Sequence, residues 1–314
     1  MGVVHLAGIG TSPGAVTSAL AYLKEEMPVP VNRDIVEELI LFTSPEVRNG
    51  DPPAEWHKWN TYGITHPRMG WESPRQQPNV LEVVQRFLQR EQILPQRGKV
   101  YVWVVDTNDF DSCFEAVAKV VVAKGDPMGT GKHLWANLTG GTNVLNAAIL
   151  EAAIFSGLIA RLYYTFVGGG YRHYLQPAAK GRPDRFDFRD VTFFKVVFDE
   201  RYYELLKVLA DMGENWMEDD VLLSRFKCRV SQIDPNFNIQ RLRTQYLNHM
   251  HGRELERDGS RNRLSKWGHK VLKLLEDDLY KALIRREEAP PPGLVEKYRE
   301  ELEKRLWWRA NDPA

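Results

Sequence analysis

The sequence has few cysteines and no segment suited to a membrane. Its 314 residues include only Cys113 and Cys228, which are too few for a disulfide framework and lack the spacing of metal ligands. The longest apolar stretch, residues 147–159, is interrupted by a glutamate, a serine and a glycine, so it does not resemble a membrane span. No signal-like segment opens the sequence. We therefore expect a cytoplasmic protein with reduced thiols, no metal ion and no membrane partner.

An excess of one charge is also missing. Lysine and arginine together number 42, aspartate and glutamate together number 42, and the formal net charge is zero. The whole chain therefore has no long-range attraction for nucleic acid, and any basic surface must be local. The sequence also lacks a G-x-G-x-x-G fingerprint and a P-loop lysine. These absences disfavour a dehydrogenase or an ATPase, and we expect no cofactor.

Short apolar runs alternate with helical patterns along residues 1–198. The apolar runs are residues 3–9, 39–43, 100–105, 133–138 and 160–167, and the helical patterns are residues 13–24, 78–91, 111–124 and 142–155. This alternation is typical of an α/β fold, a parallel sheet covered by helices on both faces. Residues 171–198 predict antiparallel strands at the sheet edge. Residues 46–77 lack periodicity and predict a functional or lid-like loop.

Two glycine-containing loops follow the first and fourth predicted strands. They consist of Gly10, Thr11, Ser12, Pro13 and Gly14, and of Thr139, Gly140, Gly141, Thr142 and Asn143. Glycines let the backbone approach a ligand closely, the hydroxyl and amide groups add hydrogen bonds, and the N-terminus of the following helix favours an anion. Strand-to-helix turns with caps are the alternative interpretation of either loop. Two such loops at one sheet edge favour a site for a phosphate-bearing ligand.

The order and setting of these motifs resemble a known family. Residues 9–13 (IGTSP) and 137–142 (NLTGGT) look like the CARF domains of type III CRISPR defence. The resemblance implies a homodimer that binds a cyclic oligoadenylate, most commonly cyclic tetra-adenylate, across its two-fold axis. Asn143 stands where many members carry a lysine. This departure shifts the expectation from cleaving the ligand toward sensing it.

The composition changes near Asp199. Helical patterns precede a hairpin pattern around Asp258-Gly259, and another helical pattern follows it, which is the layout of a winged helix-turn-helix. Residues 287–293 predict a proline-rich linker and residues 294–309 a charged terminal helix. The expected domains are thus a Rossmann-like CARF domain at 1–198, a winged helix-turn-helix domain at 199–286, and the linker with its helix at 287–314.

Residues 225–273 carry a local basic excess. They contain twelve basic and four acidic residues, and such an excess suits phosphate contacts. Residues 238–250 would form the recognition helix and residues 257–263 the wing. The residues predicted to contact double-stranded DNA are Gln240, Arg241, Arg243, Thr244, Gln245, Arg257, Arg261 and Arg263. A winged helix used only for dimerisation is the alternative.

Three functions remain open. The leading hypothesis is a cyclic-oligoadenylate-responsive regulator that binds DNA. The second is a metal-independent ring nuclease that cleaves the same ligand, in which Thr11 and Ser12 would be the catalytic residues. The third is a HEPN ribonuclease, for which Arg243–His249 and Arg263–His269 fit the Arg…His pattern loosely. A HEPN domain is an all-helical bundle, and the predicted hairpin does not suit one.

Overall fold

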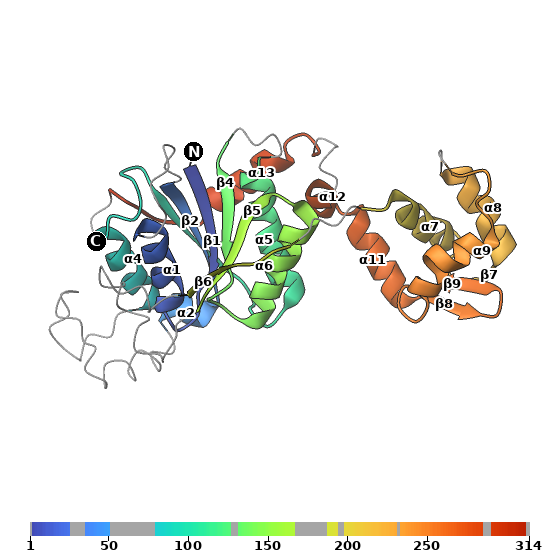
Figure 1. The fold of residues 1–314 in the computed structure, drawn as a ribbon, viewed down its shortest axis with the longest axis horizontal. Helices are drawn as coiled ribbons and strands as arrows, with labels where there is room; N and C mark the ends of the chain where they lie inside the picture. The colour runs from blue at the N-terminus through green and yellow to red at the C-terminus, as the bar shows by residue number, and fades with distance from the viewer. Residues whose placement is uncertain are drawn as a thin grey trace. The chain divides into compact units, whose positions relative to one another are not determined.

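The computed structural model describes most of the chain as two compact units. The first unit comprises Met1–Val196 and Ala289–Ala314, and the second comprises Val197–Glu288. The described residues are 2–25, 35–50, 79–126, 131–166, 187–193, 198–230, 233–284 and 290–311. Most of the predicted loop at 46–77, and the residues after the fifth predicted strand up to 186, lie outside these ranges. Figure 1 shows both units.

A seven-stranded, mostly parallel sheet forms the centre of the first unit. Its strands in spatial order are β10 (Leu306–Arg309), β3 (Lys99–Val104), β2 (Ile35–Thr43), β1 (Gly2–Gly8), β4 (His133–Asn137), β5 (Ile159–Phe166) and β6 (Asp187–Asp190). The five inner strands are parallel, and the edge strands β10 and β6 are antiparallel to their neighbours. Inner strands are buried on both faces, which explains their continuous apolar runs. The predicted α/β class is confirmed.

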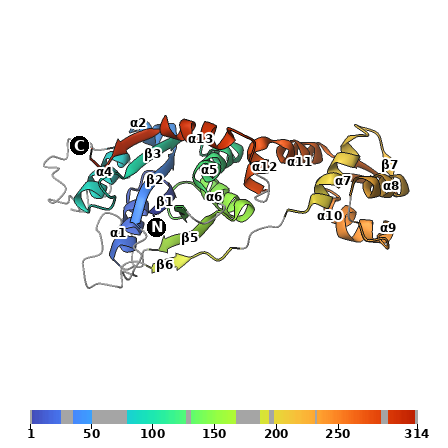
Figure 2. The same ribbon diagram turned by 90° about the horizontal axis from the view of Figure 1, so that it is seen from above.

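Helices cover both faces of this sheet (Figures 1 and 2). α1 (Gly14–Glu25) and α4 (Val80–Arg90) pack with the strands into one apolar cluster. α5 (Phe110–Lys124), α6 (Asn143–Ser156) and α13 (Leu294–Glu303) pack together on the other face. The short α2 (Pro45–Asn49) follows β2. As predicted, Gly157 ends α6, and its φ of 56° is the left-handed conformation that favours glycine.

The strand order reverses between β1 and β4. The chain leaves β1 through α1 toward β2, whereas it leaves β4 through α6 toward β5, which lies on the opposite side. The carboxyl ends of β1 and β4 are therefore neighbours, while the helices that follow them cover opposite faces. In open parallel sheets this is the place where a crevice for ligands forms. Both predicted loops start there.

The C-terminal segment differs from its prediction. Residues 294–309 were expected to form one terminal helix outside the α/β domain, but the helix α13 ends at Glu303 and the strand β10 follows it. Trp308 is only 5% exposed and belongs to the apolar cluster that holds α1 and α4. Because burying a tryptophan is strongly favourable, the segment joins the sheet edge beside β3. The first unit is thus built from both ends of the chain.

The second unit combines helices with a small sheet. Its elements are α7 (Glu200–Ala210), β7 (Met217–Glu218), α8 (Asp219–Arg229), α9 (Ile239–Leu242), the π-helical η4 (Arg243–Leu247), α10 (Asn248–Met250), β8 (Leu255–Asp258), β9 (Arg261–Leu264), α11 (Lys266–Glu276) and α12 (Asp278–Ile284). The three strands lie in the order β7-β9-β8 and are antiparallel. The predicted hairpin is confirmed, and Gly259 turns it with a φ of 61°.

This small sheet does not fit a HEPN ribonuclease. The Arg263–His269 pair spans the strand β9 and the first turn of α11, so it does not lie on one helix. Arg243 and His249 do lie in one helical stretch, but Arg243 is held by an aspartate of α8. An all-helical bundle with a paired Arg and His is therefore not what these residues form.

One buried histidine gives the first unit a pH-dependent stability. His5 is fully buried, its Nε2 contacts the hydroxyl of Tyr163, and its Nδ1 has no partner among the described residues. Burial lowers the pKa of His5 to about 3. The unfolded chain therefore binds a proton below about pH 6.5 that the folded chain does not, so stability falls as the pH decreases from about 6.5 toward the folded pKa.

We expect His5→Gln to remove this dependence. Between pH 7 and pH 4.5 the wild type should lose about 2 to 3 kcal/mol more unfolding free energy than the variant does. Urea unfolding of both proteins at the two pH values measures the difference. Equal losses in the two proteins would contradict the burial of a neutral imidazole.

Candidate functional site

The first loop is anchored to the neighbouring strand β2. Ile9 N donates to Phe42 O at 2.9 Å, and Thr43 Oγ1 donates to Ile9 O at 3.0 Å. Pro13 O then accepts from Thr17 N at 3.0 Å and so opens α1. The N–H groups in the first turn of a helix have no intrahelical partner, and together with the helix dipole they favour an anion. Residues 10–12 are thus held between a fixed strand end and a helix N-terminus.

Ser12 contributes an unused hydroxyl to this loop. Its Oγ is buried and has no hydrogen-bond partner within the part of the chain that is described. A buried polar atom without a partner is unfavourable, and native proteins tolerate few of them. A ligand that supplies the missing partner would remove this penalty. Ser12 is therefore the side chain in the loop that is best suited to a ligand contact.

The second loop begins the helix α6 in the same way. Thr142 is its N-cap, with Oγ1 accepting from Leu145 N at 3.3 Å, and the same hydroxyl donates to Thr107 O at 3.0 Å. Gly141 has a φ of 80°, which only glycine adopts without strain. Gly141 and Asn143 are exposed. The hydroxyl of Thr142 therefore shapes the loop, while the backbone at Gly141 and the side chain of Asn143 remain accessible.

The side chains of Asn137 and Thr139 form hydrogen bonds within the protein. The amide of Asn137 donates to Ala15 O at 3.0 Å and accepts from Thr139 N at 2.8 Å, so it joins α1 to the second loop. Thr139 Oγ1 accepts from Thr165 N at 2.7 Å and lies 2.8 Å from the hydroxyl of Thr165. Thr139 was predicted as a ligand contact, but the structure commits its hydroxyl to β5.

The second loop packs against the end of β1 through glycines. A Cβ atom built on Gly140 would lie 2.2 Å from Gly8 O and 3.2 Å from the Cβ of Ala15. A Cβ atom built on Gly8 would lie 2.8 Å from Gly140 O. Such distances leave no room for any side chain, so close packing of the second loop on the end of β1 requires glycine at both positions. Gly10, by contrast, has open space around it.

These contacts with β1 and α1 place the two predicted loops next to each other. Neither five-residue loop contains an ionisable side chain, so the positive potential comes from backbone N–H groups and two helix N-termini. Such a cradle can bind and orient a phosphate, but its ten residues supply no general acid or base. Chemistry there would depend on alignment and on stabilising negative charge.

Three residues that shape the site were not among the predicted ligand contacts. Gly8 ends a continuous apolar run, Asn137 ends another, and Thr107 follows β3. Their roles are contacts between segments far apart in the chain, which no local pattern reveals. The one sequence signal was Asn137, a polar residue at the end of an apolar strand and the first residue of the motif at 137–142. Among the described residues, no cluster of three or more His, Cys, Asp or Glu is placed to hold a metal ion.

The predicted recognition helix exposes uncharged polar side chains. Residues 239–250 form one helical stretch in which the middle is π-helical, a local form often found at functional sites. The stretch buries Leu242, Tyr246 and Leu247. The predicted contacts Gln240, Thr244 and Gln245 are exposed. Amide and hydroxyl groups on a helix surface are able to contact base edges.

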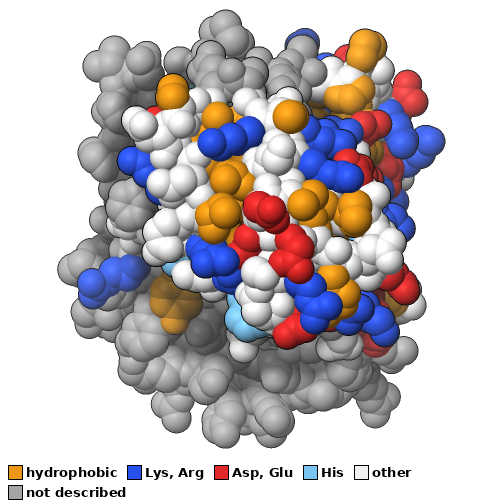
Figure 3. All heavy atoms as spheres, turned by 90° about the vertical axis from the view of Figure 1, so that its right-hand side faces the viewer, with side chains coloured by type: hydrophobic (Ala, Val, Ile, Leu, Met, Phe, Trp, Pro, Cys, Tyr) orange, Lys and Arg blue, Asp and Glu red, His pale blue; other side chains and the backbone are white. Residues whose placement is uncertain are grey.

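The predicted arginine contacts, in contrast, are all engaged by carboxylates. The pairs are Arg241 with Asp234, Arg243 and Arg257 with Asp219, Arg261 with Asp258, and Arg263 with Glu256. Figure 3 shows that basic and acidic side chains are intermixed on the face it displays. A carboxylate beside each guanidinium reduces the local positive potential and would repel a phosphate. The count of basic residues thus overstates the charge of this surface.

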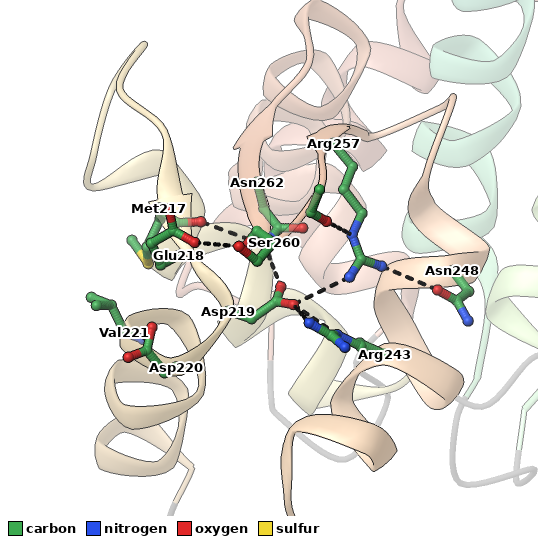
Figure 4. Close-up of polar contacts among 11 residues, drawn as sticks. Met217, Glu218, Asp219, Asp220, Val221, Arg243, Asn248, Arg257, Ser260 and Asn262 are labelled. Atoms are coloured by element: carbon green, nitrogen blue, oxygen red, sulfur yellow. Dashed lines mark hydrogen bonds and ion pairs between the residues drawn. The ribbon is translucent and has the colours of Figure 1, made fainter.

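Asp219 holds the hairpin to the predicted recognition helix (Figure 4). Asp219 is only 3% exposed. The carboxylate accepts from Arg243 Nε at 2.7 Å, from Arg257 Nη2 at 3.2 Å and from Asn262 Nδ2 at 2.6 Å. Arg257 also donates to Asn248 Oδ1 at 3.2 Å. One buried carboxylate therefore joins α8, η4 and both hairpin strands.

The chain has only limited similarity to the known proteins with which it was compared. No family model matches the chain. An uncharacterised protein of Archaeoglobus fulgidus is 28% identical over 193 residues, which cover 53% of this chain and 57% of that protein.

Two solved structures are also similar in part. Enterococcus italicus Csm6 bound to cyclic hexa-2'-fluoro-hexa-dAMP has a TM-score of 0.38 and 12% identity, covering 80% of this chain and 53% of that one. Protein VC1899 from Vibrio cholerae has a TM-score of 0.29 and 9% identity, covering 90% of this chain and 66% of that one. The chain thus spans less than two thirds of the length of each of these proteins. TM-scores this low do not establish a common fold. Within the described residues, no helix has the length and apolar character needed to cross a membrane.

Proposed function

We propose that this chain is a CARF-type sensor that binds a cyclic oligoadenylate at the loops after β1 and β4. One observation carries the proposal: both loops meet at the reversal point of a parallel sheet, where two helix N-termini and the unpartnered Ser12 Oγ converge on one edge. Phosphates suit such a cradle because it offers hydrogen-bond donors without a competing carboxylate in either loop. The motifs at residues 9–13 and 137–142 resemble those of CARF domains in sequence and in order. We therefore propose a cyclic oligoadenylate, rather than any other phosphate, as the ligand.

The proposed assembly is a homodimer. A cyclic oligoadenylate repeats the same phosphate group around a ring, so a two-fold axis would present two equivalent cradles to two equivalent parts of the ligand. Each subunit would supply Ser12 from the first loop and Gly141 with Asn143 from the second. Binding of one ring to two chains is the expected stoichiometry.

For the second unit we propose a winged helix-turn-helix that responds to the ligand by binding DNA. Its order of helix, strand, two helical segments and hairpin, with the three-stranded sheet β7-β9-β8, supports this proposal. The exposed amides of Gln240 and Gln245 are suited to base edges. A ligand that favours one dimer geometry would change the spacing of the two winged helices.

A ring nuclease is the second candidate, and the free hydroxyl of Ser12 favours it. In that reaction a ribose 2′-OH attacks the adjacent phosphorus, the bond to the 5′-oxygen breaks, and a cyclic phosphate and a 5′-hydroxyl result. The loops would align the groups and stabilise the negative charge.

Incubation of the full chain with cyclic tetra-adenylate or cyclic hexa-adenylate, followed by chromatographic separation, tests both candidates. We expect a bound ligand that remains intact, because neither loop supplies an acid or base. Linear products would show that the chain is a ring nuclease. If neither ligand binds, the proposed sensor function is wrong.

We expect Ser12→Ala to weaken ligand binding without weakening the fold. A hydrogen bond to a charged group contributes about 1.5 to 3 kcal/mol, so the dissociation constant should rise roughly tenfold to a hundredfold. The unfolding free energy should not fall, because the hydroxyl has no partner to lose. Calorimetric titration and urea unfolding of the same preparation measure the two effects. An unchanged affinity would contradict the role of Ser12.

A further inference from the structure

The second unit is inserted between the two outermost strands of the large sheet. β6 precedes this unit in the chain, and α13 with β10 follows it. β6 and β10 form opposite edges of the seven-stranded sheet. The second unit therefore has one covalent connection to each edge of the sheet, whereas a domain that simply follows another domain has a single connection.

The first connection leaves a fixed point on β6. The guanidinium of Arg161 on β5 donates to both carboxylate oxygens of Asp190, at 2.6 and 3.0 Å. Directly after this pair, Val191 N donates to Leu162 O at 2.8 Å. α7 of the second unit begins at Glu200, so the connection between the two fixed points is eight residues long.

The second connection ends at another fixed point, on β3. Leu302 of α13 and Trp308 of β10 are buried, and the hydroxyl of Tyr101 on β3 donates to Glu303 Oε1 at 2.6 Å. Nine residues separate the end of α12 from the start of α13. We name residues 290–311, which contain α13 and β10, the C-terminal segment.

The candidate site lies between these two fixed points. β1, β2 and β3 lie on the side of β10, and β4 and β5 lie on the side of β6. Ser12 belongs to the loop after β1 and Asn143 to the loop after β4, so a ligand that contacts both residues bridges the two sides. Packed elements shift past one another by about 1 to 2 Å in switching transitions. A shift of this size would change the separation of the fixed points.

Two short connections transmit such a shift better than one. Chains of eight and nine residues span at most about 30 Å when they are fully extended. A domain on one flexible connection can rotate freely, so a ligand bound elsewhere has no means of favouring one of its orientations. A second connection removes part of this rotational freedom.

We propose that the C-terminal segment anchors the second unit at the β3 edge and that the two connections together transmit ligand binding to that unit. The inference rests on the proposed sensor function. It gives α13 and β10 a role in transmission, in addition to closing the edge of the sheet. Ligand affinity should not depend on the second connection, because neither loop of the candidate site belongs to the C-terminal segment.

Cutting the second connection after the protein has folded tests this role. The recognition sequence of a specific protease would be inserted after Glu288, at the boundary between the two units. An insertion of equal length that the protease does not cut, treated in the same way, is the matched control. Because the C-terminal segment buries apolar side chains against the first unit, gel filtration should recover it with the rest of the cut chain. Its release would contradict the anchor.

A dye on Cys228 would report the rotation of the second unit. Cys228 is exposed and Cys113 is buried, and burial raises the pKa of the Cys113 thiol to about 11. A thiol-reactive dye should therefore label the second unit alone. Time-resolved fluorescence anisotropy measures how freely this unit rotates, and calorimetry on the same preparation measures the binding of cyclic tetra-adenylate and cyclic hexa-adenylate.

In the uncut control we expect the bound ligand to change the amplitude of this rotation. After cleavage the amplitude should rise about twofold, and the ligand should bind with the affinity of the control but no longer change the amplitude. An unchanged response after cleavage, or a loss of ligand binding on cleavage, would overturn the proposed transmission and leave the sensor function intact. A control that binds the ligand without any change in rotation would do the same. A control that binds neither ligand would overturn the sensor function and this inference with it.

Discussion

Replacing Gly140 with alanine should disrupt the site and weaken the first unit. The new Cβ atom would meet Gly8 O at 2.2 Å, and neither that carbonyl nor the loop behind it can move without shifting β1. Overpacking of this kind costs about 1 to 3 kcal/mol. Because the new methyl group would contact backbone atoms rather than a flexible side chain, we expect the unfolding free energy to fall by an amount near the upper value. Urea unfolding measures this loss, and calorimetry should detect no binding of cyclic tetra-adenylate.

Gly10→Ala is the matched control for this variant. It places the same methyl group in the first loop, where no atom beyond the adjacent residues lies within 4 Å of the new Cβ, so we expect an unfolding free energy close to that of the wild type. If Gly140→Ala were as stable as Gly10→Ala and bound the ligand normally, the second loop would not pack on the end of β1 as described.

Replacing Asp219 with alanine should have the largest effect in the second unit. The substitution leaves the guanidinium groups of Arg243 and Arg257 and the amide of Asn262 without their shared acceptor. Removal of one partner from a buried ion pair costs about 3 to 5 kcal/mol. The Arg243 side chain is 37% exposed and can regain water, so a loss near 3 kcal/mol is expected. Urea unfolding of the variant and the wild type, followed by tryptophan fluorescence, measures it.

Glu256→Ala removes a carboxylate from an exposed pair in the same hairpin and serves as its control. Glu256 and Arg263 have side chains that are 45% and 36% exposed, and exposed pairs contribute about 0 to 1 kcal/mol. A similar, small loss in the two variants would mean that Asp219 is one surface charge among others rather than the link between α8, η4 and the hairpin.

The sequence predicted those elements whose signals are local. Continuous apolar runs marked the inner strands, and a glycine after residue 156 marked the end of α6. The Asp258-Gly259 pair indicated a tight turn, and the hairpin forms there with Gly259 and Ser260 as its two turn residues. In each case the pattern within about ten residues decides the conformation, because strand alternation, caps and turns depend on neighbouring side chains.

Features that depend on distant partners were not predictable in this way. β10 directly follows a charged helix in the sequence. It forms a strand because it pairs with the edge of β3, which lies about 200 residues earlier in the chain. The excess of positive charge in residues 225–273 was counted correctly, yet Asp219 lies outside that window and neutralises two of its arginines. A charge count along the chain contains no information on pairing across the fold. The contacts of Gly8 and Asn137 at the site likewise involve segments far apart in the chain, so the local sequence pattern does not show them.

The central claim, that the loops after β1 and β4 hold a cyclic oligoadenylate, is tested most directly by calorimetric titration of the full chain. Cyclic tetra-adenylate and cyclic hexa-adenylate would be compared with linear tetra-adenylate, with Gly140→Ala measured alongside. We predict saturable binding of one cyclic ligand per two chains, which is lost in Gly140→Ala. The absence of binding by the wild type, or unchanged binding by Gly140→Ala, would contradict the site.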